Sequence, residues 1–534
     1  MVSAVPSNAS SAPNAPQSTG FSDSPVSPSS PGAPVSPGSR AKALPQPSPP
    51  ARPRAPWWTF ALVSAAGVVM TLDVTVVNIA LFDIARDLDA GLGKVQWVIS
   101  AYSLAFGALL LTGGALSDRV GRRAVFVTGT GLFTLASAAC GLAPDAATLI
   151  VARSVQGLGG ALMFAPALAL LATVYEDEAR RRAAIAAFAA ISSGAGALGP
   201  VVGGVFVQGP GWRWIFLVNI PIGVLIVVGA LARMPESSAR GATARRVDVP
   251  GALLAVGALL ALHYPLVAGP EQGWTTPGVL GSVVVGLALV AALIRSQRRG
   301  DGLLDLALLR VRAFSGAAVL GFLARVAGLG SLAFITLWLA TAYAYSPLET
   351  GLHLLPLTGG LLVVGLFVAR LQRAFPPHAL VAAGFALKAL GLLALAAAGG
   401  GAPPAVTFAG LLLLGAGGAV VFPPLMGIAV GAVPADRTGM ASGLTNACLP
   451  LGTAAGVAVF GAAFSAHLAA RLGPDEELRA AVATARFDLV PEASRAAARD
   501  AFSDAFTTVC LTAAVVCALG VLAARTLRPS AETG

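Results

Sequence analysis

Gly114-Ala-Leu-Ser-Asp118-Arg119-Val-Gly121-Arg122-Arg123 is the stretch that decides the fold of this chain. It places four charged side chains between residues 118 and 123, and a long apolar segment lies on each side. Both segments, 95–116 and 123–142, reach the roughly 20 apolar residues that a helix needs to cross a bilayer. A short charged turn between two such segments is typical of a hairpin at a membrane surface. We therefore expect a membrane protein whose second and third spans join here.

The composition supports a membrane protein. Of 534 residues, 56% are hydrophobic and only 11% are charged, with a mean hydropathy of +0.78. Soluble domains usually carry about 25% charged residues. The formal net charge of +10 does not indicate nucleic-acid binding, because the basic residues are spread over short loops instead of covering one face. Lipid is the expected partner, and nucleic acid is not.

Fourteen apolar segments are long enough to be candidate spans. They cover 57–81, 95–116, 123–142, 146–173, 183–208, 214–233, 249–268, 276–295, 313–343, 350–371, 378–398, 405–430, 440–463 and 504–527. Lys and Arg concentrate in the loops after the even-numbered spans, as at 180–182, 245–246 and 298–299, whereas the opposite short loops hold only Arg86, Lys94 and Arg213. Because basic loops stay inside, this asymmetry predicts that both termini are cytoplasmic.

The spans divide into six, two and six. Residues 1–56 form a Ser/Pro/Ala-rich tail with almost no bulky apolar residues, so we expect it to be disordered and cytoplasmic. Residues 57–233 form a first six-helix half, 249–296 an inserted helix pair, and 313–527 a second six-helix half. The second half contains a long predicted external loop, 464–503.

Four further stretches carry a family resemblance, together with the loop at 114–123. They are Leu72-Asp-Val-Thr-Val-Val-Asn-Ile-Ala-Leu81, Arg153-Ser-Val-Gln-Gly-Leu-Gly159, Gly194-Ala-Gly-Ala-Leu-Gly-Pro-Val-Val-Gly-Gly204 and Trp212-Arg-Trp-Ile-Phe-Leu-Val-Asn-Ile-Pro-Ile-Gly223. In this order they resemble the motifs of the fourteen-span drug:proton antiporter branch of the major facilitator superfamily, a branch of multidrug efflux transporters. The resemblance covers about residues 57–460.

This resemblance implies an all-α membrane protein with the major facilitator fold, in which each half is built from inverted three-helix repeats. It implies a plasma-membrane carrier, not an enzyme, that exports amphipathic small molecules by alternating access. The proton gradient drives transport, so no cofactor or metal is expected, and a monomer suffices. The cavity would lie between the halves, lined by spans 1, 4, 9 and 12. Alternatives are a metabolite or siderophore exporter, a proton-symporting importer, and a membrane sensor or lipid flippase.

Asp73 and Arg153 are the predicted proton-coupling residues. Asp73 lies deep in the first span, where a carboxylate facing lipid is costly, so we expect it to face the cavity. Arg153 is its natural partner in the fourth span, and Gln156 lies on the same helix face. Burial and a nearby cation act in opposite directions on a carboxyl group, so Asp73 could titrate as access alternates. The alternative is a structural hydrogen bond.

The loop at 114–123 is predicted to act as a latch that favours one access state. Gly114 and Gly121 allow a tight turn. Asp118 can pair with a basic partner or a helix N-terminus, and Arg119, Arg122 and Arg123 lie at the headgroups. Alternatively, the arginines only set the topology.

On the fifth span, small residues permit close helix approach and Pro200 permits a bend, as expected of a helix that rocks between the halves. Gly199, Pro200, Gly203 and Gly204 belong to the stretch that the family resemblance identifies as the antiporter motif. Pure packing would explain the glycines equally well.

Cargo preference is predicted from charge. Asn78, Gln156 and Arg325 are the candidate cavity residues, and Arg325 would face the cavity from the ninth span. Asp73 is the only acidic residue well inside the predicted spans, against Arg153, Arg325 and Lys388. We therefore expect a cavity that favours neutral or anionic cargo over lipophilic cations. Lys388 is expected to snorkel or to make an interhelical bond, in either case away from the substrate.

Overall fold

The computed structural model describes residues 56–175, 177–236, 248–297, 308–433 and 438–527. These residues form α-helices with a few 3-10 turns, and none of them lies in a strand. The tail predicted to be disordered lies outside the described residues, except for Pro56, which begins the first helix.

Every predicted span coincides with one helix or with a pair of consecutive helices. The first half holds α1 (Pro56–Asp87), α2 (Leu92–Val120), α3 (Arg122–Gly141), α4 (Ala146–Phe164), α5 (Ala167–Val174), α6 (Glu178–Gln208), α7 (Trp214–Leu217) and α8 (Asn219–Arg233). The inserted pair is α9 (Val249–Gln272) and α10 (Pro277–Gln297). The second half holds α11 (Arg312–Ala327), α12 (Leu329–Ala342), α13 (Pro347–His353), α14 (Leu355–Ala374), α15 (Pro377–Gly399), α16 (Pro404–Gly431), α17 (Thr438–Leu472), α18 (Glu476–Ala483) and α19 (Arg495–Ala524).

Thirteen helices of the described chain are long and apolar enough to cross a membrane, and α2 makes the fourteenth when the 49° bend between Leu110 and Thr112 is counted within one span. Four spans are broken into two helices each: α4 and α5, α7 and α8, α11 and α12, and α13 and α14. Pro166 lies between α4 and α5, where its missing N–H interrupts the helical hydrogen bonds.

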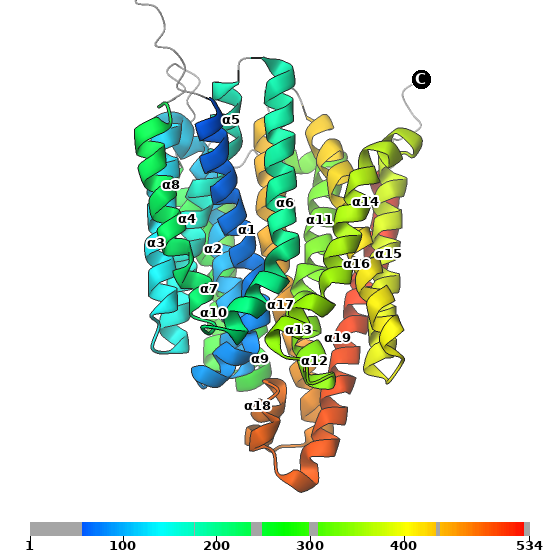
Figure 1. The fold of residues 1–534 in the computed structure, drawn as a ribbon. Coiled ribbons are helices and arrows are strands. Elements are labelled where there is room, and N and C mark those ends of the chain that lie inside the picture. The colour runs from blue at the N-terminus through cyan, green and yellow to red at the C-terminus, as the bar shows by residue number, and fades with distance from the viewer. Residues whose placement is uncertain (1–55, 176, 237–247, 298–307, 434–437, 528–534) are drawn as a thin grey trace, which may run out of the picture. The chain divides into compact units, whose positions relative to one another are not determined.

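The helices run between two ends of the bundle (Figure 1). We call the end that carries α18 the distal end; α1 ends there and α2 begins there. The opposite end, where α1 begins and α19 ends, is the proximal end. The predicted topology would make the distal end external.

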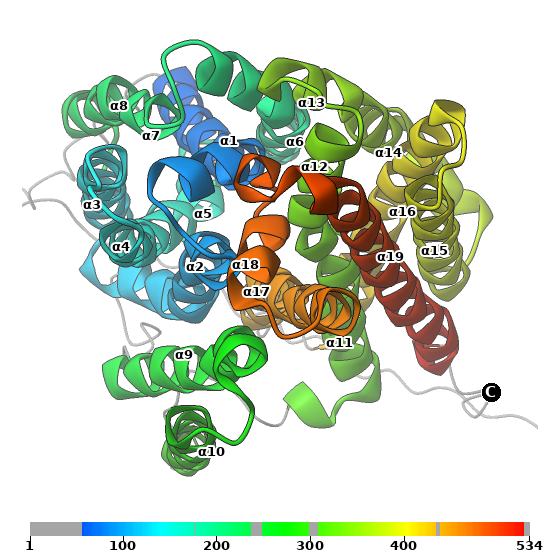
Figure 2. The ribbon, with the colours of Figure 1, turned by 90° about the horizontal axis from the view of Figure 1, so that it is seen from below.

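The two halves contact each other mainly through two helix pairs, α2 with α17 and α6 with α13. The inserted pair lies at the periphery, outside the α2–α17 contact (Figure 2). Its first helix, α9, packs against both α2 and α17, while α10 packs mainly on α9. The pair therefore covers one seam between the halves.

The predicted external loop is shorter than 464–503. Helix α17 continues to Leu472 and α19 begins at Arg495, so the connection covers 473–494 and contains α18 and two 3-10 turns. The sequence pattern marks only the apolar part of each helix, and both helices extend beyond it with polar turns. The Ala/Glu-rich helical pattern of this segment corresponds to α18.

Candidate functional site

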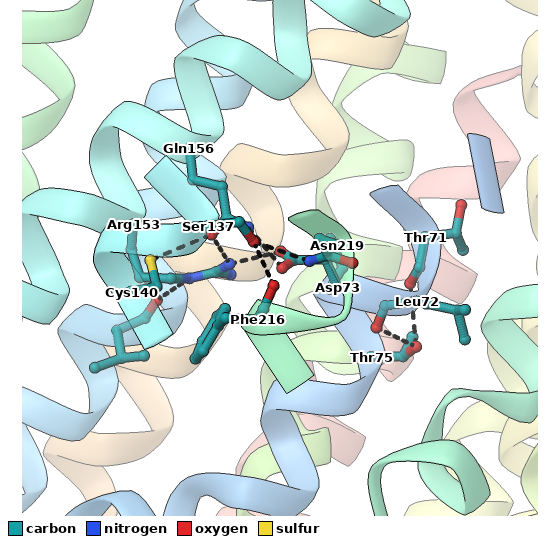
Figure 3. Close-up of polar contacts among 12 residues, drawn as sticks. Thr71, Leu72, Asp73, Thr75, Ser137, Cys140, Arg153, Gln156, Phe216 and Asn219 are labelled. Atoms are coloured by element: carbon teal, nitrogen blue, oxygen red, sulfur yellow. Dashed lines mark hydrogen bonds and ion pairs between the residues drawn. The ribbon is translucent and has the colours of Figure 1, made fainter. Parts of the chain in front are cut away.

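A buried ion pair lies inside the first half. Asp73 of α1 and Arg153 of α4 meet with 2.5 Å between carboxylate Oδ2 and guanidinium Nη1, and their side chains are 1% and 2% exposed. Arg153 also donates to Val98 O at 3.2 Å and to Gln156 Oε1 at 2.7 Å (Figure 3). The expected pairing of Asp73 with Arg153 is confirmed by this geometry.

Gln156 forms hydrogen bonds with both members of the ion pair. Its Nε2 donates to Asp73 Oδ1 at 2.8 Å and to Ser137 Oγ of α3 at 3.0 Å. Ser137 also accepts from Asn219 Nδ2 at 3.0 Å and donates to Phe216 O at 3.1 Å. Both oxygens of the carboxylate therefore have donors, which is what a buried charge requires to be stable.

The start of α4 places Arg153 at this site. Asp145 caps the helix by accepting from Thr148 N at 2.8 Å. That backbone hydrogen bond stabilises the charged form and holds the pKa of the exposed Asp145 carboxyl below its usual range. Arg153 and Gln156 follow about two to three turns later, three residues apart and therefore on one face. Gly157 lets α4 approach α2, because a Cβ there would lie 2.4 Å from Tyr102 O.

Tyr102 separates the ion pair from the space between the halves. Its ring centroid lies 4.3 Å from the Arg153 guanidinium carbon, a cation–π contact. The same side chain lines the central cavity, and its hydroxyl has no hydrogen-bond partner in the described structure. Asp73 does not line that cavity. The expectation that it faces the cavity is therefore wrong for this conformation, because Arg153 and Gln156 hold the carboxylate on the inner side of α1.

The central cavity has a volume of about 360 Å³. It is lined from both halves, by residues of α1, α2, α4, α6, α11, α12, α14 and α17. On α17 the lining residues, 446–453, lie toward the proximal end, and on α2 they lie near the middle of the helix, at 102–110. Spans 1, 4 and 9 contribute as predicted, but span 12, which is α16, does not. Its apolar side chains pack within the second half, against α14 and α15.

Arg325 lies in the cavity wall, as predicted. It is the only charged residue among the described residues that line the central cavity. Its Nε has no hydrogen-bond partner in the described chain, and its guanidinium carbon lies 4.8 Å from the Phe422 ring centroid. A partly exposed cation held by an aromatic face can bind an acceptor or an anion.

Asn78 and Gln156 lie elsewhere than expected. Gln156 is fully buried in the ion-pair network and does not line the central cavity. Asn78 lies one turn beyond Thr75 on α1 and lines a separate cavity at the distal end. Sequence spacing placed both side chains at the right depth, but it did not distinguish the cavity face of each helix from the packed face.

The glycines of α6 allow close packing against two helices, α1 of the same half and α13 of the other half. A Cβ on Gly199 would collide with Thr75 of α1, and one on Gly203 would lie a tight 3.1 Å from Val76 O, so these two positions bring α6 against α1. A Cβ on Gly204 would lie 2.6 Å from Pro347 O of the second half. From the other side, a Cβ on Gly351 would lie 2.3 Å from Pro200 O. The Pro200–Gly204 segment therefore closes the halves against each other near the distal end.

The predicted loop at 114–123 is mostly helical: 114–120 complete α2, 122–123 begin α3, and only Gly121 lies between the two helices. Its described ion pairs stay within this stretch or reach the segment just after α8. Arg122 pairs with Asp118 at 2.8 Å, and Arg123 contacts Glu236 at 3.4 Å and donates to Met234 O at 3.1 Å. Gly121 adopts a φ of +126°, and a Cβ there would lie 2.7 Å from Glu236 Oε1. Arg119 is exposed, and no atom lies within 4 Å of a Cβ built on Gly114. A latch between the halves stays a prediction.

Lys388 makes an interhelical bond, which is one of the two roles expected of it. This buried side chain of α15 donates to Ala324 O, next to Arg325, at the break between α11 and α12. Sequence reasoning missed Tyr102, Ser137 and Cys140, whose Sγ donates to Gln156 Oε1 at 3.5 Å. Small polar and aromatic residues are common in apolar helices, so no spacing signal marked these three. Asn219 lies in the stretch 212–223 quoted for the family resemblance, but no role was assigned to it, and none was assigned to Glu236, which follows α8.

Two six-helix halves around a central cavity, with an ion pair buried beside it, are the architecture of a secondary transporter. The family model of the Major Facilitator Superfamily matches residues 63–457. This chain belongs to the major facilitator superfamily, and it is a multi-pass membrane transporter.

Curated relatives cover most of the chain. The multidrug resistance protein Stp of Mycobacterium tuberculosis (strain CDC 1551 / Oshkosh) is 37% identical over 409 residues, which are 76% of this chain and 75% of the relative. The puromycin resistance protein pur8 of Streptomyces alboniger is 35% identical over 78% of this chain and 83% of its own length. The tetracenomycin C resistance and export protein of Streptomyces glaucescens is 34% identical over 76% and 75%.

Solved structures share the fold. A bacterial homologue of the human lysosomal transporter Spinster, in an inward-facing and unoccupied conformation, aligns with a TM-score of 0.64 at 15% identity over 90% of this chain and 100% of that chain. At this identity the likeness concerns the fold alone.

Proposed function

We propose that this protein exports amphipathic small molecules in exchange for protons by alternating access, with Asp73 as the proton carrier. The single observation that carries the proposal is the position of the Asp73–Arg153 pair. It is buried, fully hydrogen-bonded and one aromatic ring away from the central cavity. A titratable group inside a membrane helix is by default a functional group.

The surroundings of Arg153 make the pair breakable. When Asp73 takes up a proton, the guanidinium loses its anionic partner but keeps Val98 O, Gln156 Oε1 and the Tyr102 ring. The cation is then not left without partners, so the cost of protonation is lower than for an isolated pair. Protonation thereby changes the packing of α1 against α2 and α4.

Tyr102 would transmit this change to the substrate. Its ring lies on Arg153 on one side and lines the central cavity on the other. A substrate that packs against Tyr102 and a proton on Asp73 therefore bias the same side chain. Two ligands that bias one two-state element are coupled, and the coupling acts in both directions.

The direction of transport rests on the relatives. Their names describe resistance to or export of drugs, namely puromycin, tetracenomycin C and unspecified multiple drugs. These names favour export by this chain. The geometry alone would also fit a metabolite exporter or a proton-symporting importer on the same scaffold. Nothing in the geometry favours a sensor or flippase.

Charge sets the proposed cargo. The central cavity presents Arg325 and no described acidic residue, so a lipophilic cation would meet a like charge there. We propose neutral or anionic amphiphiles as preferred cargo. The carrier would need only the proton gradient and the bilayer, and a single chain contains the whole cavity.

The test uses the purified full-length chain in proteoliposomes with an imposed pH gradient. Radiolabelled puromycin and an anionic amphiphilic dye are compared with ethidium. The proposal predicts movement of puromycin and the dye against the proton flow, with ethidium transported at least tenfold more slowly. Movement with the proton flow would show symport, and equal transport of ethidium and the anionic dye would reject the charge preference.

A further inference from the structure

A second cavity lies at the distal end, with a volume of about 230 Å³. Both halves line it: Asn78 and Asp83 on α1, Thr336 and Thr341 on α12, and Thr350 on α13. The segment after α18 contributes Phe487, and α19 contributes Arg499. None of these residues lines the central cavity. The family match and the curated relatives assign nothing to this space.

Two buried polar atoms in its wall have no partner. Asn78 is 6% exposed and Thr350 is 1% exposed, and neither Asn78 Oδ1 nor Thr350 Oγ1 forms a hydrogen bond within the described chain. The amide orientation of Asn78 is fixed by its neighbours. Its Nδ2 donates to Val74 O at 3.0 Å, and since a carbonyl can only accept, Oδ1 must be the atom that points away. An unpaired buried polar atom costs about 1–3 kcal/mol, so such atoms call for a ligand or water.

One of the two charged groups in the lining, Asp83, adds to this acceptor character, whereas Arg499 is a donor. Asp83 is half-buried and Arg499 is exposed at the rim. Neither forms an ion pair with any residue that the structure describes, and Arg499 lies over the Phe487 ring at 5.8 Å. Asn78, Thr350 and Asp83 in the wall thus bring two buried unpaired oxygens and a carboxyl to the edge of this cavity. These groups suit a hydrogen-bond donor.

The distal cavity is the next space along the path between the halves. On α1, Thr75 lines the central cavity and Asn78 the distal one; on α12, Leu332 lines the central cavity and Thr336 the distal one. These spacings are about one helical turn, or roughly 5 Å along the axis. A layer one turn thick, together with the Pro200–Gly204 contact on α13, therefore separates the two cavities.

The backbone around the distal cavity is strained. Ala344 and Ala485 line it with φ values of +53° and +58°. A left-handed conformation is costly for a residue with a Cβ, and such strain concentrates at ligand sites and moving segments.

We propose that the distal cavity is a second substrate site, which binds a hydroxyl or amide N–H group of the exported amphiphile after it leaves the central cavity. This inference rests on the proposed export function. Pockets that hold whole drug-sized ligands measure roughly 300–1,000 Å³, so the distal cavity, at about 230 Å³, accommodates the donor-bearing head group and not the entire molecule.

The test uses the full chain in nanodiscs and two matched probes, 2-naphthol, which donates a hydroxyl hydrogen, and 2-methoxynaphthalene, which cannot. Thr341→Cys places a thiol in the distal cavity, and its reaction with a water-soluble maleimide is timed with each probe present. Three native thiols are buried, at Cys140, Cys510 and Cys517, and the unsubstituted chain gives the background. We expect 2-naphthol to slow labelling at least fivefold and its methyl ether less than twofold. Adding Asn78→Leu should remove the difference.

Equal protection by the two probes would overturn the proposal, and so would protection that persists in both Asn78→Leu and Thr350→Val. Thr350→Val preserves the shape of the side chain and serves alone if Asn78→Leu does not fold. Naphthol protection together with failure of pH-driven transport in proteoliposomes would reject the export function while leaving the distal site in place. Loss of protection with intact transport would reject the distal site alone.

Discussion

Asp73 and Arg153 show what a sequence can reveal about single residues and what it cannot. An acid and a base deep in apolar segments must find each other or a cavity, so their pairing was predictable. The ring that covers them was not, because Tyr102 is one of many aromatic side chains in apolar helices. Nor could spacing show that Asp73 faces α3 and α4, since several helical faces are equally buried by composition alone.

Removal of one partner should cost more than removal of both. Arg153→Met leaves the carboxylate of Asp73 buried without its cation, and we expect a loss of about 3–5 kcal/mol in stability. Asp73→Leu combined with Arg153→Met should recover much of that loss, because an apolar pair needs no desolvated charge. Thermal unfolding in detergent measures the stability of the single and the double variant. Arg182→Met, at an exposed pair with Glu178, is the control and should change stability by less than about 1 kcal/mol. A double variant as unstable as the single one would contradict this reasoning.

The aromatic ring of Tyr102, not its hydroxyl, should matter. The hydroxyl has no partner, so Tyr102→Phe should keep pH-driven transport within twofold of the unsubstituted rate. Tyr102→Leu keeps an apolar side chain but removes the ring face on Arg153, worth about 2 kcal/mol for a desolvated cation, so we expect transport to fall at least tenfold. Equal rates for the two variants in proteoliposomes would show that the ring does not couple the sites.

Helices α6 and α13 form one of two close contacts between the halves near the distal end; α2 and α17 form the other, where a Cβ on Gly461 would lie 1.9 Å from Gln96 Nε2. The positions of the helices were predictable, because about 20 apolar residues identify a span without any tertiary information. The points at which single spans break into two helices were harder to predict. Pro166 marks one, but Gly328, between α11 and α12, resembles the many glycines that only serve packing. Which glycine faces the other half likewise depends on how helices from distant parts of the chain pack.

A methyl group at Gly204 should open the distal contact. Its Cβ would lie 2.6 Å from Pro347 O, a backbone atom that cannot move alone, so Gly204→Ala should shift the population toward a conformation with the distal end open. Gly194→Ala on the same helix is the matched control, because no atom lies within 4 Å of its Cβ. Spin labels on Glu349 and Asp89 would report the distance between the halves. A longer distance in Gly204→Ala, but not in Gly194→Ala, is expected; unchanged distances in both would argue against this contact as the distal closure.

At the scale of the whole molecule, the halves meet along two seams, α2 with α17 and α6 with α13, and the inserted pair covers only the first. Helix α9 packs across α2 and α17, whereas the seam between α6 and α13 has no such cover among the described helices. The division into six, two and six was predictable from the number and order of spans. The peripheral place of the pair was not, because α9 and α10 are apolar along their whole length and composition does not say which helices they meet.

The predicted topology can be tested on the intact chain. Because basic loops stay inside, Glu178→Cys at the proximal end should react with a membrane-impermeant thiol reagent only from the cytoplasm. Glu476 begins α18 at the distal end, so Glu476→Cys should react only from outside. Labelling of intact cells and of inverted vesicles gives both readings. A reversed pattern would place the termini outside and turn the proposed export into import.

The central claim is that Asp73 carries the proton for export. The most direct measurement compares Asp73→Asn with the unsubstituted chain in proteoliposomes, using puromycin in two modes: uptake driven by a pH gradient, and exchange of labelled for unlabelled puromycin without a gradient. Asn keeps the shape and can still accept from Arg153, but it cannot exchange a proton. We predict that pH-driven uptake falls at least tenfold while exchange stays within about threefold. Unchanged pH-driven uptake in Asp73→Asn would contradict the claim and move proton coupling to another residue.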